Sequence, residues 1–256
     1  MSEWPLPAEL PDPMQPAIVA EPIPEAYPFW GYKDLLMLLV IVFLVTQIGG
    51  LAIVALGFIW PSPVLTLLLT QFVVYGAGIL VLYGVVGRRY GRPFWQAIRW
   101  PAPRVTLLRW ATAGIATALL GSLLAAAIGA QDIEQLPMKE LLSSRSMVIV
   151  VGVLAVTLGP LWEELTFRGF LQPLLAKNLG DAAAILISAG AFSILHGPQY
   201  GWDWRALLPV AFAGACFGVA RTITGSTGVA AGMHAIYNLT VFSAFLAQGG
   251  ADNIPW

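Results

Sequence analysis

Two adjacent glutamates and an arginine stand in an otherwise apolar stretch of the sequence. Glu163 and Glu164 are followed four residues later by Arg168. Residues four apart on a helix share a face, so Glu164 and Arg168 can form an ion pair. Glu163 is rotated by about 100° from its neighbour and points elsewhere. The spacing predicts one carboxylate held by a cation and one left for chemistry. A structural ion-pair network between two helices is the alternative.

Only two histidines occur in the chain, and the first, His196, ends an apolar run. A turn of the type Asn-Leu-Gly-Asp occupies 178–181, about sixteen residues after Glu163 and about sixteen before His196. In an antiparallel helical hairpin, equal distances from the turn mean equal depth. Glu163 and His196 are therefore expected to face each other, and such a carboxylate–imidazole pair can activate a water. The alternative is a structural histidine at a helix end.

The second histidine, His234, precedes Asn238 by four residues. This spacing places the imidazole and the carboxamide on one helix face. Both groups can donate hydrogen bonds to a developing oxyanion. A polar contact between helices is the alternative. His234 lies about six residues from the inner end of its expected helix, which offsets it by about 15 Å from Glu163 and His196. Either the Glu163–His196 hairpin protrudes, or the helix boundaries differ.

The elements that carry these residues must be membrane helices, because the composition excludes a soluble protein. Apolar residues make up 58% of the 256 residues and charged residues 11%, whereas a soluble domain has about 25% charged residues. The net charge of −1 does not indicate the positively charged surface that binds nucleic acid. The single cysteine, Cys216, excludes an internal disulfide framework and a cysteine-based zinc site.

Apolar stretches of about 20 residues, the length that crosses a bilayer, recur along the chain. We predict an all-α, polytopic transmembrane helix bundle over 31–256 with about seven membrane helices. The count is eight if the fourth segment breaks at Gly159–Pro160. The expected segments are 35–59, 63–86, 107–129, 146–162 continuing to 177, 182–195, 206–220 and 229–246.

The chain begins differently, with eight prolines and five acids in its first 28 residues. Such a stretch cannot bury a core, so 1–30 is expected to form a proline-rich, disordered tail. Cytoplasmic loops carry an excess of Lys and Arg. Placing the arginine-rich loop 88–104 in the cytoplasm puts nine basic residues inside and three outside, which predicts a cytoplasmic amino terminus. The nine are Lys33, Arg88, Arg89, Arg92, Arg99, Arg104, Arg109, Lys177 and Arg221, and the three are Lys139, Arg145 and Arg205.

Three motifs in order connect these observations to a known family. EExxxR stands at 163–168, FxxxH at 192–196 and HxxxN at 234–238. With these motifs the sequence resembles the CPBP family (CAAX proteases and bacteriocin-processing enzymes, also called Abi). The resemblance covers roughly 146–246, which would be the catalytic core. It implies an intramembrane endopeptidase similar to the type II CAAX prenyl endopeptidases, in an integral membrane protein. We expect this membrane to be the plasma membrane of a prokaryote.

The resemblance also implies roles for the motif residues. In the family, the first glutamate and the second motif's histidine activate a water, while the third motif's histidine and asparagine form the oxyanion hole. Carried over to this chain, the four catalytic residues are Glu163, His196, His234 and Asn238. Glu164 and Arg168 would support and orient the site. The implied substrate is a peptide or protein at the membrane, with prenylated CAAX carboxyl termini as one class, and no cofactor is implied.

Two other functions fit the same residues. A catalytic zinc takes three protein ligands and a water, and Glu163, His196 and His234 could supply the ligands. A non-proteolytic membrane protein is the other alternative, as a scaffold, an immunity protein or a carrier with a proton relay, because intramembrane Glu and His also mark proton paths. Glu163→Gln separates the classes: a scaffold would tolerate it, and a glutamate protease would not.

Overall fold

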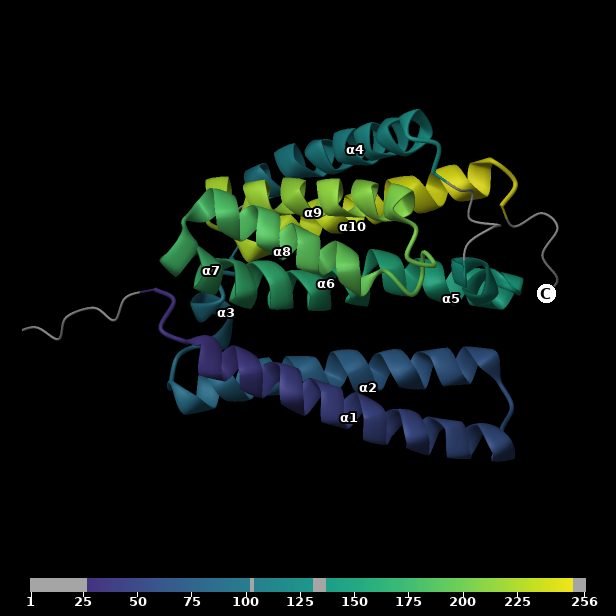
Figure 1. Ribbon diagram of the computed structural model, residues 1–256, viewed down its shortest axis with the longest axis horizontal. Coiled ribbons are helices and arrows are strands. Elements are labelled where there is room, and N and C mark those ends of the chain that lie inside the picture. Colours follow the sequence, from purple (N-terminus) through teal and green to yellow (C-terminus); the bar gives the residue numbers. More distant parts are fainter. Residues whose placement is uncertain (1–26, 102–103, 131–136, 251–256) are drawn as a thin grey trace, which may run out of the picture.

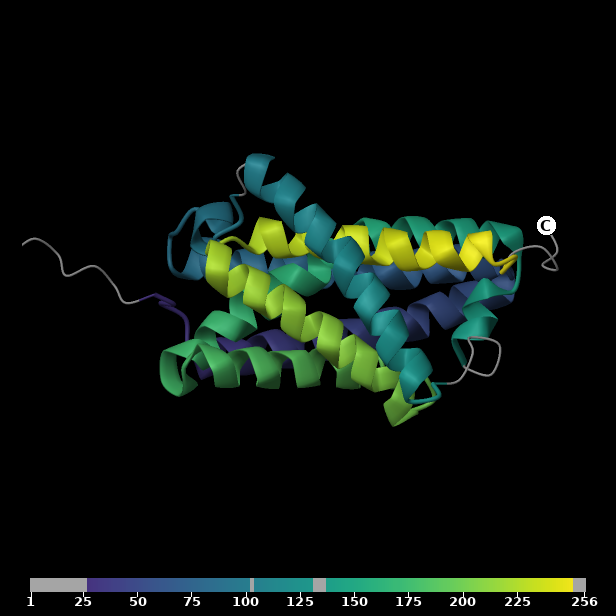
Figure 2. The same ribbon diagram turned by 90° about the horizontal axis from the view of Figure 1, so that it is seen from above.

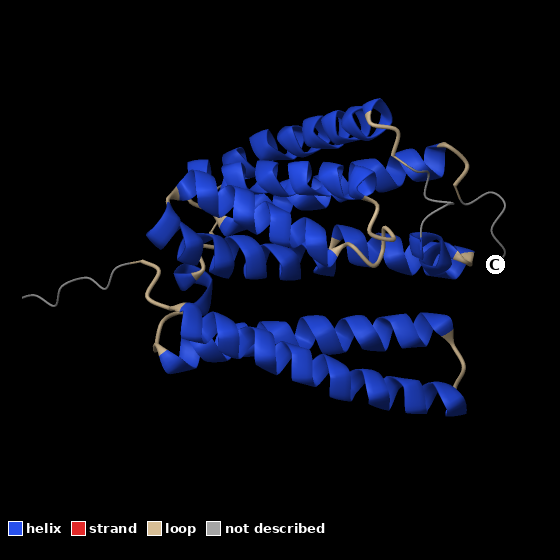
Figure 3. Ribbon diagram, viewed as in Figure 1, coloured by secondary structure: helices blue, strands red, loops and turns tan. Residues whose placement is uncertain are grey.

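The computed structural model describes residues 27–101, 104–130 and 137–250. Every regular element in these ranges is helical (Figure 3), which confirms the all-α prediction for this part of the chain. Two segments, η1 and η4, are π-helical and η3 is a 3-10 helix. The elements are α1 (Tyr32–Ile59), α2 (Pro63–Tyr83), η1 (Gly84–Arg89), α3 (Phe94–Ala97), α4 (Arg104–Ala127), η3 (Pro137–Leu142), α5 (Arg145–Val156), α6 (Leu158–Glu164), η4 (Leu165–Leu171), α7 (Gln172–Leu179), α8 (Asp181–Leu195), α9 (Trp204–Thr224) and α10 (Thr227–Ala247).

Six helical runs in the described residues are long and apolar enough to cross a membrane. They are α1, α2 with η1, α4, the run from α5 to α7, α9 and α10. The remaining segment, α8, is apolar but has only 15 residues, short of the about 20 that a span needs. The expectation of a polytopic helical membrane protein is confirmed, whereas the count of seven full-length spans is not met.

The fourth segment does break, at Thr157 between α5 and α6. Thr157 has φ −119° and ψ −84°, outside the helical region. Pro160 follows closely and has no N–H to bond the carbonyl of Val156, four residues earlier. The run nevertheless continues as one 35-residue stretch to Leu179. The break therefore adds no eighth span.

The helices form two groups that lie side by side (Figure 1). The larger group contains α4 to α10, and the smaller is the hairpin of α1 and α2. The hairpin touches the larger group through α2, where Gly78 faces Trp162. A Cβ on Gly78 would overlap Trp162 Cη2, so the indole can occupy this position only beside a glycine.

The segment before α1 fixes one end of the hairpin. Of the expected tail, residues 1–26 lie outside the described residues, and 27–30 pack against the larger group. Trp30 is 1% exposed, stacks on Phe170 with ring centroids 5.2 Å apart, and donates from Nε1 to the Phe170 carbonyl at 3.0 Å. Lys177 Nζ donates to the Pro28 carbonyl at 3.1 Å. The base of the hairpin is thus attached to η4 and α7.

The connections gather at two ends of the bundle (Figures 1 and 2). The start of α1, the segment from η1 through α3, the α7–α8 turn and the α9–α10 connection lie at one end, which we call the basic end. The α1–α2 turn, η3, the α8–α9 connection and the end of α10 lie toward the other, which we call the opposite end. The α7–α8 turn extends farther at the basic end than the α9–α10 connection does.

Candidate active site

A fully buried ion pair lies at the centre of the larger group. Arg168 Nη1 donates to Glu164 Oε1 at 3.0 Å, and both side chains are 0% exposed. The pair expected from the four-residue spacing is therefore present. Arg168 Nη2 also donates to the Gly214 carbonyl at 2.6 Å, and the guanidinium lies 4.9 Å from the centre of the Phe192 ring. Buried charges persist when they are paired and hydrogen-bonded in this way.

The backbone of η4 is stabilised by a second arginine. In this π-helix, Gln172 N donates to the Phe167 carbonyl five residues back. The next residue, Pro173, has no N–H and cannot bond the Arg168 carbonyl in the same pattern. The buried Arg221 of α9 donates to that carbonyl instead, from Nε at 3.2 Å. A side chain from another helix thus supplies the donor that proline removes.

His234 of α10 contacts both carboxylates. Its Nδ1 lies 2.9 Å from Glu164 Oε1, and its Nε2 lies 3.7 Å from Glu163 Oε2. The imidazole is buried and stacks on the Phe217 ring, with centroids 4.4 Å apart. The hairpin geometry had paired Glu163 with His196, so the direct contact between Glu163 and His234 is a feature that sequence spacing did not reveal.

His196 occupies the carboxyl-terminal cap of α8. Its Nδ1 lies 2.8 Å from the Phe192 carbonyl, and its ring is 4.6 Å from that of Phe192. His196 and Glu163 line the same cavity. No direct hydrogen bond joins their side chains in the described part of the chain. The two groups therefore share a space into which a reactant could enter, as expected, without touching each other.

Asn238 lies one helical turn beyond His234 and lines the same cavity. Its Nδ2 donates to the Ala155 carbonyl at 2.6 Å, next to the break at Thr157. An amide nitrogen carries two hydrogens, so this bond leaves one free to donate. The four-residue spacing therefore brings both side chains to the same cavity, as predicted.

The cavity has a volume of about 270 Å³ and is walled by six α-helices, the 3-10 helix η3 and the α8–α9 connection. Its walls are mostly aliphatic and aromatic, which limits water and strengthens electrostatic contacts. The candidate residues in its lining are Glu163, His196, His234 and Asn238, whereas Glu164 and Arg168 lie behind it. The other lining residues are Leu67, Gln71, Tyr75, Met138, Leu141, Leu142, Val151, Leu154, Ala155, Gly159, Phe192, Gln199, Tyr200, Val210, Ala213, Phe217, Tyr237, Val241, Phe242 and Phe245.

Several polar side chains in this lining lie outside the three motifs. Gln71 and Tyr75 come from α2, and Tyr200 comes from the connection between α8 and α9. Burial raises the pKa of Tyr200, and the negative charge of Glu163 raises it further. The phenol therefore stays protonated and can donate a hydrogen bond. No spacing in the sequence connects these residues to the motifs, because they reach the cavity from distant elements.

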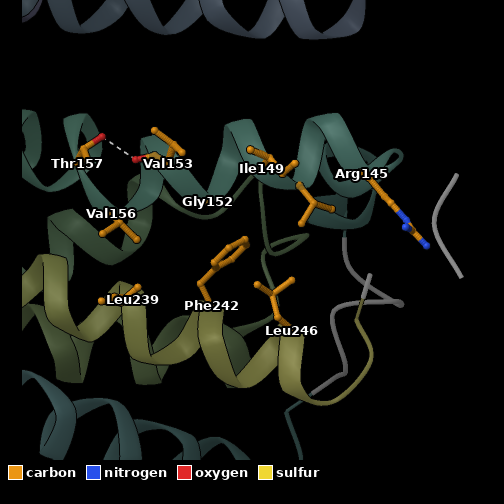
Figure 4. A pocket seen from close by; sticks show the side chains of 10 residues that line it. Arg145, Ile149, Gly152, Val153, Val156, Thr157, Leu239, Phe242 and Leu246 are labelled. Atoms are coloured by element: carbon orange, nitrogen blue, oxygen red, sulfur yellow. Dashed lines mark hydrogen bonds between the residues drawn. The ribbon is translucent and has the colours of Figure 1, made fainter. Parts of the chain in front are cut away.

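A larger apolar groove, of about 550 Å³, runs between α5 and α10 (Figure 4). Its one charged lining residue is Arg145, and Phe242 borders both this groove and the cavity. None of the candidate catalytic residues lines it. Apolar walls without convergent polar groups do not make a catalytic site. The smaller cavity is therefore the candidate active site.

The zinc alternative requires three ligands close together. In residues 27–101, 104–130 and 137–250, no three His, Cys, Asp or Glu side chains gather in a way that could hold a metal ion. Glu163 and His234 lie close together, but the Nδ1 of His196 is directed to the Phe192 carbonyl. Chelation, described below, is the direct test of this alternative.

Comparison with known proteins supports the resemblance noted from the motifs. The family model described as type II CAAX prenyl endopeptidase Rce1-like matches residues 145–240. This segment contains all three motifs and nearly coincides with the expected core of 146–246. No curated protein and no solved structure matches the chain.

Proposed function

We propose that this chain, whose residues 145–240 match the Rce1-like family model of type II CAAX prenyl endopeptidases, hydrolyses a peptide bond by a water that Glu163 and His196 activate. The match to the family supports a CAAX-type membrane protease in general, and the glutamate mechanism is our own extension. The observation that carries it is the contrast between the two glutamates. Glu163 is 23% exposed in the cavity, whereas Glu164 is 0% exposed and is bonded to Arg168 and His234.

In the proposed mechanism, water enters the cavity between Glu163 and the imidazole of His196. Glu163 takes a proton from the water as the oxygen attacks the peptide carbonyl. The carboxyl group can then give that proton to the leaving amine. His196 orients the water by a hydrogen bond. Its imidazole can also hold the proton, in turn with Glu163, before the leaving amine receives it. The apolar walls of the cavity exclude bulk water from these steps.

His234 and Asn238 are proposed to stabilise the tetrahedral oxyanion. An ionised Glu164 only accepts hydrogen bonds, so the His234 nitrogen beside it must carry a hydrogen. Donation from Nε2 to an oxyanion requires that this nitrogen also carries a hydrogen. Asn238 supplies the second donor with its free amide hydrogen. Removal of one such donor typically costs about 10²–10³-fold in rate.

We further propose that the protein lies in a prokaryotic plasma membrane with its amino terminus in the cytoplasm. The support is the distribution of basic residues, nine at one end and three at the other, which the positive-inside rule converts into an orientation. The proposed substrate is a peptide or protein at this membrane. Prenylated CAAX peptides are the first probes to use, because the family is described by that activity.

The test uses detergent-purified protein with farnesylated and unmodified CAAX-ending peptides, and the products are read by mass spectrometry. Glu163→Gln should lower cleavage by about 10²–10⁴-fold, the usual contribution of a general base. Glu140→Gln, an exposed glutamate of η3, is the matched control and should keep full activity. A parallel sample contains a metal chelator.

The outcomes separate the alternatives. Release of a carboxyl-terminal tripeptide that disappears in Glu163→Gln and survives the chelator supports the proposal. Loss of activity on chelation would replace it with the zinc mechanism. Full activity of Glu163→Gln would contradict a glutamate base. If wild-type protein cleaves none of the peptides, CAAX-type cleavage is wrong, and a different substrate or a non-proteolytic role takes its place.

A further inference from the structure

Two polar side chains of α2 line the candidate active site, although α2 lies outside the segment that the family model matches. Gln71 and Tyr75 belong to the lining of the cavity, together with Glu163 and His196. The family model matches residues 145–240. The α1–α2 hairpin therefore contributes polar groups to the cavity for which the three motifs give no role.

The Tyr75 hydroxyl lies beside the face of α6 that carries Glu163. A Cβ on Gly159 would lie 3.7 Å from this hydroxyl oxygen. Gly159 precedes Glu163 by four residues on α6, and residues four apart share a helix face. The charge of Glu163 acts on the Tyr75 phenol. No hydrogen bond joins the two side chains in the described ranges, so both border the same part of the cavity without bonding each other.

The protein itself uses neither polar group of α2. Among residues 27–101, 104–130 and 137–250, the Gln71 carboxamide and the Tyr75 hydroxyl have no hydrogen-bond partner. Gln172 is different, because its Nε2 donates to the Gly218 carbonyl and to the Thr222 hydroxyl, both at 3.0 Å. A carboxamide and a phenol can each donate and accept. On the wall of a mostly apolar cavity, such groups are available to a bound molecule.

The spacing of these two residues matches that of an extended peptide. Four residues of α2 cover about 6 Å along the helix axis, at about 1.5 Å per residue. In an extended chain every second residue faces the same side, about 6.6 Å apart at about 3.3 Å per residue. A peptide group carries one donor and one acceptor. Its burial in an apolar cavity is costly unless these are hydrogen-bonded.

We propose that Gln71 and Tyr75 bind the backbone of the substrate peptide and hold it extended in the cavity. Tyr75 bonds a peptide group next to the scissile bond, because its hydroxyl lies beside the face of α6 that carries Glu163. Gln71 bonds the peptide group two residues away. Contacts to the backbone fix the conformation and register of the substrate and leave its side-chain sequence free. This inference rests on the proposed function for its substrate, whereas peptide binding can be measured without cleavage.

The first test separates binding from chemistry. Gln71→Leu and Tyr75→Phe should each raise KM for a CAAX-ending peptide about 2–10-fold, the net value of one lost hydrogen bond. The kcat should stay within about twofold, because loss of a contact made equally in the ground and transition states raises KM alone. A fall in kcat at unchanged KM would overturn the inference, since these residues would then act on the reacting groups.

Two other positions of α2 provide matched controls. Thr70 is exposed and donates its hydroxyl to the Thr66 carbonyl, and Tyr83 is half exposed at the end of α2. Neither Thr70 nor Tyr83 lines the cavity. Thr70→Val and Tyr83→Phe should keep the wild-type KM. All four variants should keep the wild-type unfolding temperature, and equal KM values in test and control variants would overturn the inference.

The second test changes the substrate backbone. Peptides in which an ester replaces one amide lack that N–H, and each position except the scissile bond is tried in turn with wild type and Gln71→Leu. At one position the ester should weaken binding to wild type and have little further effect on the variant, as expected for two changes that remove one contact. Equal ester effects in both proteins at every position would overturn the backbone contact.

Binding of a fluorescein-labelled CAAX-ending peptide, followed by anisotropy in a Glu163→Gln background, separates failure of the inference from failure of the proposed function. Gln71→Leu should weaken binding about 2–10-fold, and Thr70→Val should not. If wild type cleaves no peptide but this pattern is found, the proposed function fails and the inference stands. If wild type cleaves and the pattern is absent, the inference alone fails. No binding of any peptide would overturn both.

Discussion

The α1–α2 hairpin and the group from α4 to α10 are both strongly apolar, yet they are stabilised differently. The hairpin exposes many large apolar side chains, and Phe58 at the end of α1 is 87% exposed. The larger group buries charged side chains that bond one another, with Arg168 and Glu164 at its centre. Lipid is as apolar as leucine, so burial of aliphatic surface gives little drive for helix association in a membrane. Ion pairs, hydrogen bonds and close packing therefore hold the group from α4 to α10 in one geometry.

The largest expected effect follows from breaking the central ion pair. Arg168→Met leaves the Glu164 carboxylate buried without its cation, which costs about 3–5 kcal/mol. Thermal unfolding in detergent, followed by circular dichroism, measures the loss. Arg205→Met removes a part-exposed arginine paired with Asp203 and should change stability by less than about 1 kcal/mol. Equal shifts for the two variants would mean that the central pair does not stabilise the larger group.

Replacing each of the two neighbouring glutamates by glutamine, in separate variants, should separate stability from activity. Glu164→Gln weakens the bonds to Arg168 and His234 and should cost about 1.5–3 kcal/mol. Glu163→Gln should leave the unfolding temperature nearly unchanged, because this side chain lines the cavity and its contact to His234 is 3.7 Å long. The pair of melting curves, beside the cleavage assay, checks the division of roles. A larger destabilisation by Glu163→Gln would contradict it.

The contact between the two groups can be broken at a glycine. Gly78→Ala places a Cβ against the indole of Trp162 and should cost about 1–3 kcal/mol through overpacking. Gly76→Ala, two residues earlier on α2, meets nothing within 4 Å and serves as the matched control. It should stabilise the helix by about 0.5–1 kcal/mol, the usual gain from replacing a helical glycine. Similar unfolding temperatures for the two variants would show that α2 does not depend on this contact.

The smallest effect is expected at the base of the hairpin. Trp30→Phe keeps an aromatic ring against Phe170 but removes the N–H that bonds the Phe170 carbonyl. The loss should be about 1 kcal/mol, the net value of one hydrogen bond. Trp204→Phe is the control, since Trp204 is exposed at the start of α9. A shift as small as that of the control would show that the Trp30 hydrogen bond contributes nothing to the attachment.

Local spacing was sufficient to predict contacts within one helix. The Glu164–Arg168 pair forms as expected, and His234 and Asn238 reach the same cavity from successive turns of α10. Spacing was less informative between helices. His234 contacts both glutamates directly, although residue counting had placed it about 15 Å away along the membrane normal. The protruding α7–α8 turn accounts for this difference, because it lets a longer hairpin reach the level of a residue near the start of α10.

Other features could not be predicted from the sequence because they combine distant segments. Tyr75 and Tyr200 join the cavity from α2 and from the α8–α9 connection, and neither belongs to a motif. Arg221 bonds the Arg168 carbonyl that Pro173 leaves without a helical donor. The sequence shows the proline and both arginines, but not that two helices bring them together.

The sequence by itself determined that this protein is an apolar helical bundle and which of its candidate site residues share a helix face. These properties depend on composition and on the helical repeat, which are local. Only the tertiary structure decided that Glu163 faces His234, that Glu164 is buried, and that Tyr75 and Tyr200 join the cavity. Such contacts depend on the tilt and offset of packed helices, and many side chains from distant segments together set these quantities.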